Sequence, residues 1–316
     1  MTASLTVLRH ELRQLGRVVV AFSGGADSAL LARVAQDTLG RDRVLCATAL
    51  SPSLAAAEAD DCRALAQEWD LRWVGVPTDE MQDPAYVANG ADRCARCKTA
   101  LMSVLGPLAE AESAHVVLGV NVSDLGDHRP GQKAAAGAGA TFPLVQAGFS
   151  KDDIRHVSRE LGLRTWDKPA AACLASRLPY GTPVTLGRLE AVEAAEAALH
   201  ALGFGQLRVR HHGPAARLEF DEEVLGAVLD RRRDVVAAVQ SAGFRFVALD
   251  LEGFTSGSMN RMLGGAARAG EMAGRPAGEL AGEPVGEPAG EPVGEPVGEP
   301  AVGPAVGPAV ESEGNL

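Results

Sequence analysis

The stretch VVVAFSGGADSALLA, residues 18–32, decides the fold. It opens with an uncharged apolar run, residues 18–22, which is typical of a buried parallel strand. Two glycines then separate this run from a helical pattern. A strand, a glycine turn and a helix N-terminus in this order predict an anion site, because the backbone can approach a phosphate and free N–H groups attract its charge. The expected phosphate contacts are Ser23, Gly24, Gly25, Asp27 and Ser28.

Asp27 is unusual in this position, because a carboxylate repels phosphate. A Mg²⁺ ion between the two removes the repulsion, so we predict that Asp27 binds Mg²⁺. The pattern differs from GxxxxGK[ST] and from GxGxxG, the two common phosphate loops. It resembles SGGxDS, the PP-loop of ATP pyrophosphatases. That resemblance implies ATP as a ligand and cleavage of ATP between its α and β phosphates.

Apolar and helical segments alternate over the first half of the chain. Strands are predicted at residues 17–22, 43–50, 71–77 and 115–120, with helices between them. The segments directly after the third and fourth strands, 78–94 and 121–135, are expected to be irregular loops, and the helix that begins near Cys94 is expected to be interrupted at Pro107. This order predicts an α/β fold with a parallel, doubly wound, Rossmann-like sheet. Ligands bind such sheets at the carboxyl ends of the strands, where both SGGADS and the loop GVNVSDLGDHRPG fall.

A second set of segments follows in a different order. A helix at 186–201, strands at 206–211 and 215–220, a helix at 221–240 and a strand at 244–249 predict a small α+β domain. We expect three parts: a PP-loop domain (1–180), this α+β domain for substrate or oligomerisation (181–263), and a tail (264–316). The tail repeats Gly-Glu-Pro, cannot bury an apolar face and is predicted to be disordered.

Charge and composition limit the partners of the chain. The net charge is −11, but the residues from Glu271 onward hold nine acidic groups and one arginine, which leaves −3 for the rest. A nearly neutral body does not attract a polyanion, so nucleic acid is not an expected partner. With no long apolar run and no signal-peptide core, we expect no membrane association and a cytoplasmic location.

Three of the five cysteines fall in loops or at the start of a helix. Cys94 and Cys97 form the motif DRCARCK, and Cys173 lies in PAAACLASRLPYG, whereas Cys46 and Cys62 are expected in the core. Zinc requires four ligands, while three thiolates with one open position suit a [4Fe–4S] cluster. A redox pair or structural thiols are the alternatives.

Five motifs together resemble the LarE family of ATP-dependent sulfur transferases in nickel-pincer nucleotide biosynthesis: SGGADS, DRCARCK, GVNVSDLGDHRPG, PAAACLASRLPYG and RVRHHGPAARLEF. The resemblance extends over residues 5–250. It implies that ATP adenylates a carboxylate of pyridinium-3,5-biscarboxylic acid mononucleotide with release of pyrophosphate. Sulfur then replaces oxygen to give a thiocarboxylate. The family also forms homo-oligomers, so we expect one here.

The resemblance implies two possible sulfur sources. In one branch of the family, the cysteine matching Cys173 gives up its own sulfur and becomes dehydroalanine. In the other branch, cysteines matching Cys94, Cys97 and Cys173 hold a [4Fe–4S] cluster that delivers an additional sulfide. The presence of all three favours the cluster branch, and sacrifice of Cys173 stays open. In both branches Cys173 and Asp27 are the expected catalytic residues.

The anionic substrate requires cations. Arg208 and Arg210 alternate along a predicted strand and therefore share a face, and guanidinium groups bind phosphate or carboxylate through two parallel hydrogen bonds. The expected substrate contacts are Arg177, Arg208, Arg210, Lys98 and Arg129. The family pattern GTNxDDxxDxRPG implies two further ATP contacts, Asn121 and Asp127. Val120 and Ser123 depart from this pattern.

Two other functions are considered. A PP-loop tRNA thiolase also combines CxxC, a distant third cysteine and a cluster, but this chain lacks a basic or aromatic RNA-binding module. A nucleotide-binding module without chemistry would not need three thiols in loops beside a PP-loop aspartate. We therefore predict a sulfur-transferring enzyme that acts on a small anionic mononucleotide.

Overall fold

The computed structural model describes residues 4–126, 130–169 and 171–255, all within one compact unit, Met1–Met272. No helix in these described ranges is long and apolar enough to cross a membrane. The predicted disordered tail, 264–316, lies outside the described residues, so its prediction stays untested.

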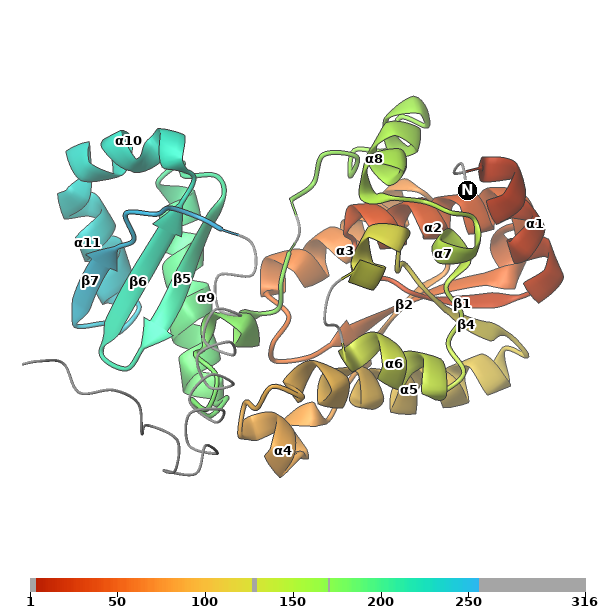
Figure 1. Cartoon of the computed structure of the whole chain (residues 1–316), viewed down its shortest axis with the longest axis horizontal. Coiled ribbons are helices and arrows are strands. Elements are labelled where there is room, and N and C mark those ends of the chain that lie inside the picture. Colours follow the sequence, from red (N-terminus) through yellow and green to blue (C-terminus); the bar gives the residue numbers. More distant parts are fainter. Residues whose placement is uncertain (1–3, 127–129, 170, 256–316) are drawn as a thin grey trace, which may run out of the picture. The chain divides into compact units, whose positions relative to one another are not determined.

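A parallel four-stranded sheet forms the first half of the protein (Figure 1). The strand order is β3-β2-β1-β4, and the register aligns Val19 with both Leu45 and Val116. The predicted α/β Rossmann-like PP-loop sheet is therefore confirmed. The strands are β1 (Val18–Ala21), β2 (Val44–Leu50), β3 (Trp73–Pro77) and β4 (His115–Leu118).

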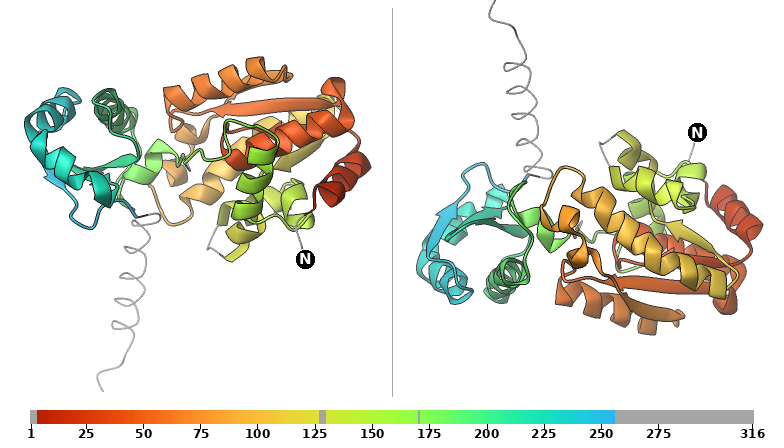
Figure 2. Two further views of the ribbon diagram at one scale, coloured as in Figure 1. Left: turned by 90° about the horizontal axis from the view of Figure 1, so that it is seen from above. Right: turned by 90° about the horizontal axis from the view of Figure 1, so that it is seen from below.

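Helices cover both faces of this sheet (Figures 1 and 2). One face packs against α1 (Leu5–Leu15), α2 (Ala26–Leu39), α3 (Ala56–Glu68), α7 (Pro143–Gln146) and α8 (Lys151–Glu160). The other face packs against α5 (Arg93–Ala111) and α6 (Pro130–Gly137). The connections add η1 (Arg41–Arg43), η2 (Glu80–Gln82), α4 (Pro84–Val87) and η3 (Val122–Gly126).

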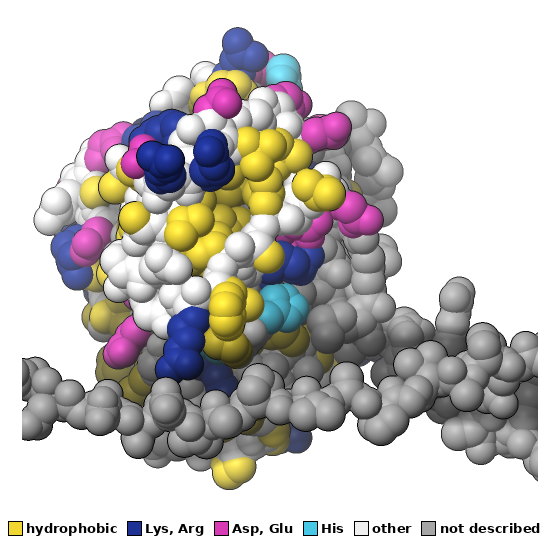
Figure 3. Space-filling view, turned by 90° about the vertical axis from the view of Figure 1, so that its left-hand side faces the viewer, with side chains coloured by type: hydrophobic (Ala, Val, Ile, Leu, Met, Phe, Trp, Pro, Cys, Tyr) yellow, Lys and Arg dark blue, Asp and Glu magenta, His cyan; other side chains and the backbone are white. Residues whose placement is uncertain are grey.

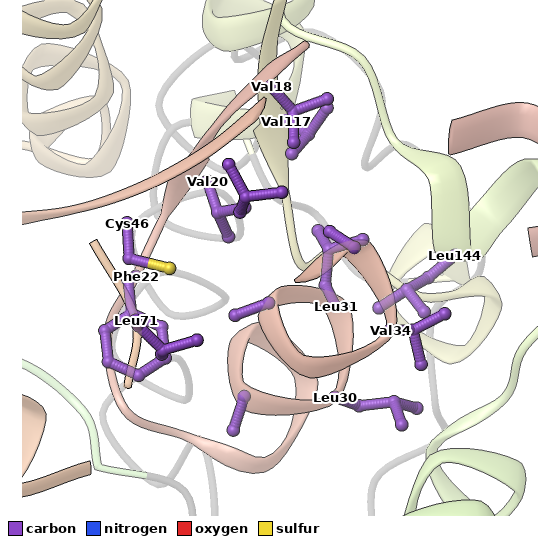
Figure 4. Close-up of a cluster of buried hydrophobic side chains, with 14 of the residues drawn as sticks. Val18, Val20, Phe22, Leu30, Leu31, Val34, Cys46, Leu71, Val117 and Leu144 are labelled. Carbon is purple, nitrogen blue, oxygen red and sulfur yellow. The ribbon is translucent and has the colours of Figure 1, made fainter. Parts of the chain in front are cut away.

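The sheet face under α2 carries a cluster of buried hydrophobic side chains (Figure 4). Side chains of β1 and β4, among them Val18, Val20 and Val117, point toward Leu31 of α2. All four are at most 1 % exposed. Burial of each such side chain contributes about 1.5–3 kcal/mol, so the strand and helix that flank the PP-loop form a rigid frame for it.

A second, three-stranded sheet has the order β5-β6-β7, with an antiparallel and then a parallel pairing. Its elements are α9 (Leu186–Ala201), β5 (Leu207–His212), β6 (Ala215–Phe220), η5 (Glu222–Val224), α10 (Leu225–Asp230), α11 (Arg232–Ser241) and β7 (Phe246–Leu249). Their buried side chains, among them Val192, Leu218 and Val239, form one hydrophobic cluster together with Tyr86 of α4 and Leu174. The end of the protein that carries α10 and α11 exposes hydrophobic side chains among arginines (Figure 3).

Four local expectations are wrong. Helix α5 continues through Pro107. Proline has no N–H, so the carbonyl of Ser103 loses its helical hydrogen bond. Both residues are exposed, and water can bond this carbonyl instead. The segment expected as one helix over 221–240 is divided into η5, α10 and α11. Arg231 leaves the helical conformation between α10 and α11 and donates to the Leu202 carbonyl. The two segments expected as irregular, after β3 and after β4, contain α4 and α6.

Candidate active site

Gly24 sets the path of the turn between β1 and α2. Its φ is +66°, and a Cβ at this position would lie 2.9 Å from Sγ of Cys62 in α3, so both conformation and space require glycine. Gly25 follows as the N-cap of α2 and provides no side chain to cap the helix. The N–H groups of the first turn thus face the turn as potential anion donors.

Ser28 closes this turn from within the helix. Its Oγ accepts a hydrogen bond from the Ser23 backbone N–H at 3.2 Å and donates to the Gly25 carbonyl at 3.2 Å. The Ser23 and Ser28 hydroxyls lie 3.1 Å apart. Ser28 is buried and Ser23 is exposed, so Ser28 holds the loop from inside while Ser23 lies at its surface.

Asp27 lies in the first turn of α2 and has a cationic partner that the sequence did not reveal. Nζ of Lys151 lies 2.9 Å and 2.8 Å from the two carboxylate oxygens of Asp27. The amide of Asn121 donates to the same carboxylate at 3.4 Å. The predicted Mg²⁺ ligand and one predicted ATP contact are therefore adjacent. The only sequence signal for Lys151 is its place after the helix-capping residue Ser150.

The loop after β4 reaches the PP-loop because Gly119 permits close contact. A Cβ on Gly119 would lie 2.8 Å from the backbone nitrogen of Ser28. This contact places Asn121 beside the start of α2. Asp127 and Arg129, which were predicted to contact ATP and substrate, lie outside the described residues.

Two segments bring the three predicted thiols into one region. Cys94 and Cys97 lie in the first two turns of α5, and Cys173 directly precedes η4 (Leu174–Arg177). Arg93, which is 5 % exposed, connects the segments by donating to the Ala175 carbonyl at 2.8 Å. The same Nη1 atom donates to Oδ1 of Asn89 at 2.6 Å. Arg93 stands beside Cys94 in the sequence, but nothing in the motif signalled its burial.

The thiols differ in environment. Cys94 and Cys173 are exposed, whereas Cys97 is half-buried. The pKa of Cys97 is raised to about 11, chiefly by burial and in addition by the nearby Cys173, while Lys98 acts in the opposite direction. Burial alone would lower the pKa of Arg93, but Cys173 and Cys94 outweigh that effect and raise it. The electrostatic influence of Cys173 thus reaches both the CxxC turn and Arg93.

The three thiols are chemically suitable ligands for an iron–sulfur cluster, but they do not form a site for a single metal ion. No group of three or more His, Cys, Asp or Glu side chains in the described ranges is arranged to hold one metal ion. A [4Fe–4S] cluster binds each thiolate at a different iron. Three thiols carried by two segments that Arg93 joins are compatible with that requirement.

Arg177 lies beneath Cys173. Its Nη1 atom donates to the carbonyls of Ala172 and Cys173 at 2.5 Å and 3.1 Å. Its Nε and Nη2 atoms donate to the two carboxylate oxygens of Glu196 in α9 at 2.9 Å and 3.0 Å. The Arg177 side chain is only 5 % exposed, so in this arrangement it supports the backbone around Cys173.

The other predicted cations lie in two places. Arg210 is buried, binds Glu219 across the strand pair at 2.6 Å and donates to the Ser176 carbonyl at 3.1 Å. Burial lowers the pKa of Arg208, and the neighbouring Arg177 lowers it further. Arg177, the last residue of η4, thus lies close to Arg208 and Arg210 of β5. Lys98 lies on α5, where a Cβ on Gly131 would meet its Cγ at 2.8 Å.

The Cys173 segment docks at the edge of the sheet that carries the PP-loop. The backbone N–H of Leu174 donates to the carbonyl of Ser53 at 2.8 Å, and Ser53 follows the carboxyl end of β2. The Ser53 hydroxyl lies 2.5 Å from the hydroxyl of Tyr86. Because β2 pairs with β1, the phosphate loop and the Cys173 segment belong to the same edge.

The chain is similar to several known proteins. Residues 2–89 match the family model of NAD synthase. An uncharacterized protein of Synechocystis sp. is 43 % identical over 83 % of this chain and 99 % of its own length. An uncharacterized protein of Methanocaldococcus jannaschii is 24 % identical over 76 % of this chain and 91 % of its own length.

A relative with a named activity is the pyridinium-3,5-bisthiocarboxylic acid mononucleotide synthase of Lactiplantibacillus plantarum. It is 41 % identical over 253 residues, which are 80 % of this chain and 92 % of the synthase. The SGGADS loop, the CxxC turn and the Cys173 segment all lie within the described fold. The chain belongs to the family of that synthase, the LarE family.

Proposed function

We propose that this protein is an ATP-dependent sulfur transferase that converts a carboxylate of pyridinium-3,5-biscarboxylic acid mononucleotide into a thiocarboxylate. The observation that supports this proposal most directly is the hydrogen bond between the Cys173 segment and Ser53. It holds that segment at the carboxyl edge of the sheet, which also carries the PP-loop. An activated carboxylate formed at the PP-loop would then lie near a thiol. The family relationship supports the same reaction.

In the first half-reaction, a carboxylate oxygen of the substrate bonds to the α-phosphorus of ATP, and pyrophosphate leaves with the bonding electron pair. The turn from Ser23 to Ser28 provides backbone donors for the phosphates. Asp27 is the proposed ligand of Mg²⁺, which would offset the negative charge of the phosphates there. Asn121 orients the Asp27 carboxylate through its amide.

In the second half-reaction, sulfur attacks the acyl carbon and AMP leaves. Adenylation is needed because a carboxylate oxygen is a poor leaving group, whereas AMP is a good one. We propose that Cys173 takes part in sulfur delivery, either as a ligand of an iron–sulfur cluster or as the sulfur donor itself. Arg177 acts as a positioning residue, because it fixes the carbonyls of Ala172 and Cys173.

The proposal includes two alternative sources of the sulfur. Cys94, Cys97 and Cys173 would hold a [4Fe–4S] cluster, which would supply a bound sulfide. Alternatively, Sγ of Cys173 forms a thioester, loss of the Cα proton breaks the Cβ–Sγ bond, and dehydroalanine remains. The three thiols support the first form, and we propose it as the main route.

The proposal is tested with purified protein, ATP, Mg²⁺ and the pyridinium mononucleotide. We expect pyrophosphate release that depends on the mononucleotide, and a product in which sulfur replaces one oxygen. Anaerobically reconstituted protein should contain about four irons, and Cys→Ser changes at the three positions should remove them. Iron-free protein that transfers sulfur and loses the elements of H₂S from Cys173 would overturn the cluster route. Pyrophosphate release that is stimulated by tRNA and not by the mononucleotide would contradict the proposed substrate.

The proposed substrate is a small anion, in agreement with the nearby arginines of η4 and β5.

The expected homo-oligomer is a further proposal that size-exclusion chromatography with light scattering tests. A monomer at micromolar concentration would contradict it.

A further inference from the structure

The motif PAAACLASRLPYG ends in a tight turn to which the proposed function assigns no role. The backbone N–H of Thr182 donates to the carbonyl of Pro179 at 2.9 Å, so Tyr180 and Gly181 are the two central residues of the turn. The φ of Gly181 is +79°, a conformation that glycine adopts without strain. The last residues of the motif therefore form a β-turn with Tyr180 at its first corner.

The buried residue Asn89 fixes this turn. Its side-chain amide donates to the carbonyls of Pro179 and Thr182, both at 2.8 Å, and its backbone carbonyl accepts from the Gly181 N–H at 3.0 Å. Asn89 is fully buried and has a φ of +57°, which is uncommon for a residue other than glycine. Backbone in this region is costly and is found preferentially at ligand sites. The turn is thus held more firmly than an ordinary surface turn.

The ring of Tyr180 lies near a buried cation and two exposed thiols. The guanidinium carbon of Arg93 is 5.6 Å from the ring centroid, and Arg93 itself is 5 % exposed. Burial raises the pKa of Tyr180, Arg93 lowers it, and the charges of Cys94 and Cys173 raise it further. Tyr180 is half-buried, whereas both thiols are exposed. A ligand that reaches these thiols can therefore also reach the ring.

The proposed substrate carries a planar ring with a positive charge. A cation is attracted to the π-face of tyrosine, and planar rings stack favourably when they are offset. The arginines expected at the site cannot supply this contact, because guanidinium groups bind carboxylate or phosphate and repel a cation. The chain has two tyrosines, and Tyr86 is only 1 % exposed, so Tyr180 is the tyrosine that a ligand can reach. Negative charge on Cys94 and Cys173 favours a cation in the same place.

We propose that Tyr180 binds the pyridinium ring of the substrate by stacking and cation–π attraction, and so selects mononucleotides whose ring is charged. This inference deepens the proposed function and rests on it. The turn fixed by Asn89 holds the stacked ring beside the thiol region. Tyr180 transfers no proton and forms no covalent bond, so its aromatic ring is required and its hydroxyl is not. Arginines bind the carboxylates and the phosphate of the substrate, while Tyr180 recognises its ring.

The test measures binding of pyridinium-3,5-biscarboxylic acid mononucleotide by calorimetry, with α,β-methylene-ATP and Mg²⁺ present so that no turnover occurs. The 1,4-dihydropyridine form of the mononucleotide, whose ring carries no charge, is the neutral probe. Tyr180→Leu should weaken the charged form by about 5- to 30-fold, because the π-face is lost, and should weaken the neutral form at least about threefold less. Tyr180→Phe keeps the π-face and should bind the charged form within about threefold of the parent protein.

Phe246→Leu is the matched control, because it removes an aromatic ring that is 64 % exposed on β7, and it should change neither affinity. Circular dichroism melts and the affinity for α,β-methylene-ATP verify that each variant keeps its fold and its PP-loop. Tyr180→Met, which can retain more of the packing against Arg93, repeats the test with the same expectation as Tyr180→Leu.

Two outcomes would overturn the inference. One is an unchanged affinity of Tyr180→Leu and Tyr180→Met protein for the charged mononucleotide. The other is an equal loss of affinity for the charged and the neutral forms, which would show a contact that does not depend on ring charge. Parent protein that binds neither form would instead contradict the proposed function on which the inference rests, so the two failures are distinguishable.

Discussion

Replacement of Arg93 by methionine should disconnect the thiol region while leaving the phosphate loop intact. Arg93 is 5 % exposed and donates two charge-assisted hydrogen bonds, to the Ala175 carbonyl and to Asn89 Oδ1. Its guanidinium also lies 5.6 Å from the ring centroid of Tyr180. Methionine fills similar space but leaves two buried acceptors without these donors.

The magnitude follows from those contacts. Each hydrogen bond to a charged group contributes about 1.5–3 kcal/mol, so the loss of both bonds should cost about 3–6 kcal/mol. The loss falls on the Ala175 segment, which holds Cys173 next to α5. We therefore expect a lower urea midpoint and faster amide exchange over residues 173–182. Asn89 should respond as well, because its amide bonds the carbonyls of Pro179 and Thr182.

The functional consequence separates the two half-reactions. Arg93→Met protein should keep most of its pyrophosphate release, since the PP-loop is fixed by β1 and α2, but should lose sulfur transfer at least tenfold. Arg96→Met is the matched control: Arg96 is 48 % exposed on the same helix and pairs with Asp92 at the surface, where solvent screens the interaction. Equal stability and equal sulfur transfer in the two variants would refute the assignment of Arg93.

Three further predictions concern the phosphate loop and the thiols. Asp27→Asn should abolish pyrophosphate release with little change in melting temperature, and retained release would contradict the metal role of Asp27. Gly24→Ala should cost about 1–3 kcal/mol in urea denaturation, because alanine disfavours a φ of +66° and its Cβ would meet a buried thiol. In metal-free protein at pH 8, iodoacetamide should label the exposed Cys94 and Cys173 faster than Cys97, whose pKa is raised to about 11 by burial. Labelling of Cys97 should increase as the pH rises from 9 toward 11, and peptide mass spectrometry that finds equal rates at pH 8 would contradict the difference in burial.

Much of the fold was predictable because its strongest signals are local. The apolar run of β1, the glycine turn and the start of α2 are contiguous, and buried parallel strands show as continuous apolar segments. Helix α9 was predicted with its observed bounds, and so was β6. The break of the helix at Arg231 was not predictable, because it depends on a contact with the Leu202 carbonyl rather than on the local pattern.

The candidate site was predictable in its motifs but not in its connections. SGGADS and the three cysteines carry their chemistry in their residue types. Lys151 lies 124 positions from Asp27, and a lysine at a helix start has no sequence signature of an ion pair. The same holds for Arg93, which reads as one more charge in DRCARCK until the fold buries it against Ala175. Arg177 and Arg210 were predicted as substrate contacts, and the structure shows what each binds in the free protein: Glu196 and Glu219.

The central claim is that adenylation at the PP-loop serves sulfur transfer to a carboxylate. The most direct measurement is mass spectrometry of the pyridinium-3,5-biscarboxylic acid mononucleotide after incubation with this protein, ATP and Mg²⁺. The account predicts a product with one oxygen replaced by sulfur, together with AMP and pyrophosphate, and no such product from Cys173→Ala protein. An unchanged mononucleotide in the presence of ATP turnover, or a thiocarboxylate formed equally well by Cys173→Ala protein, would contradict it.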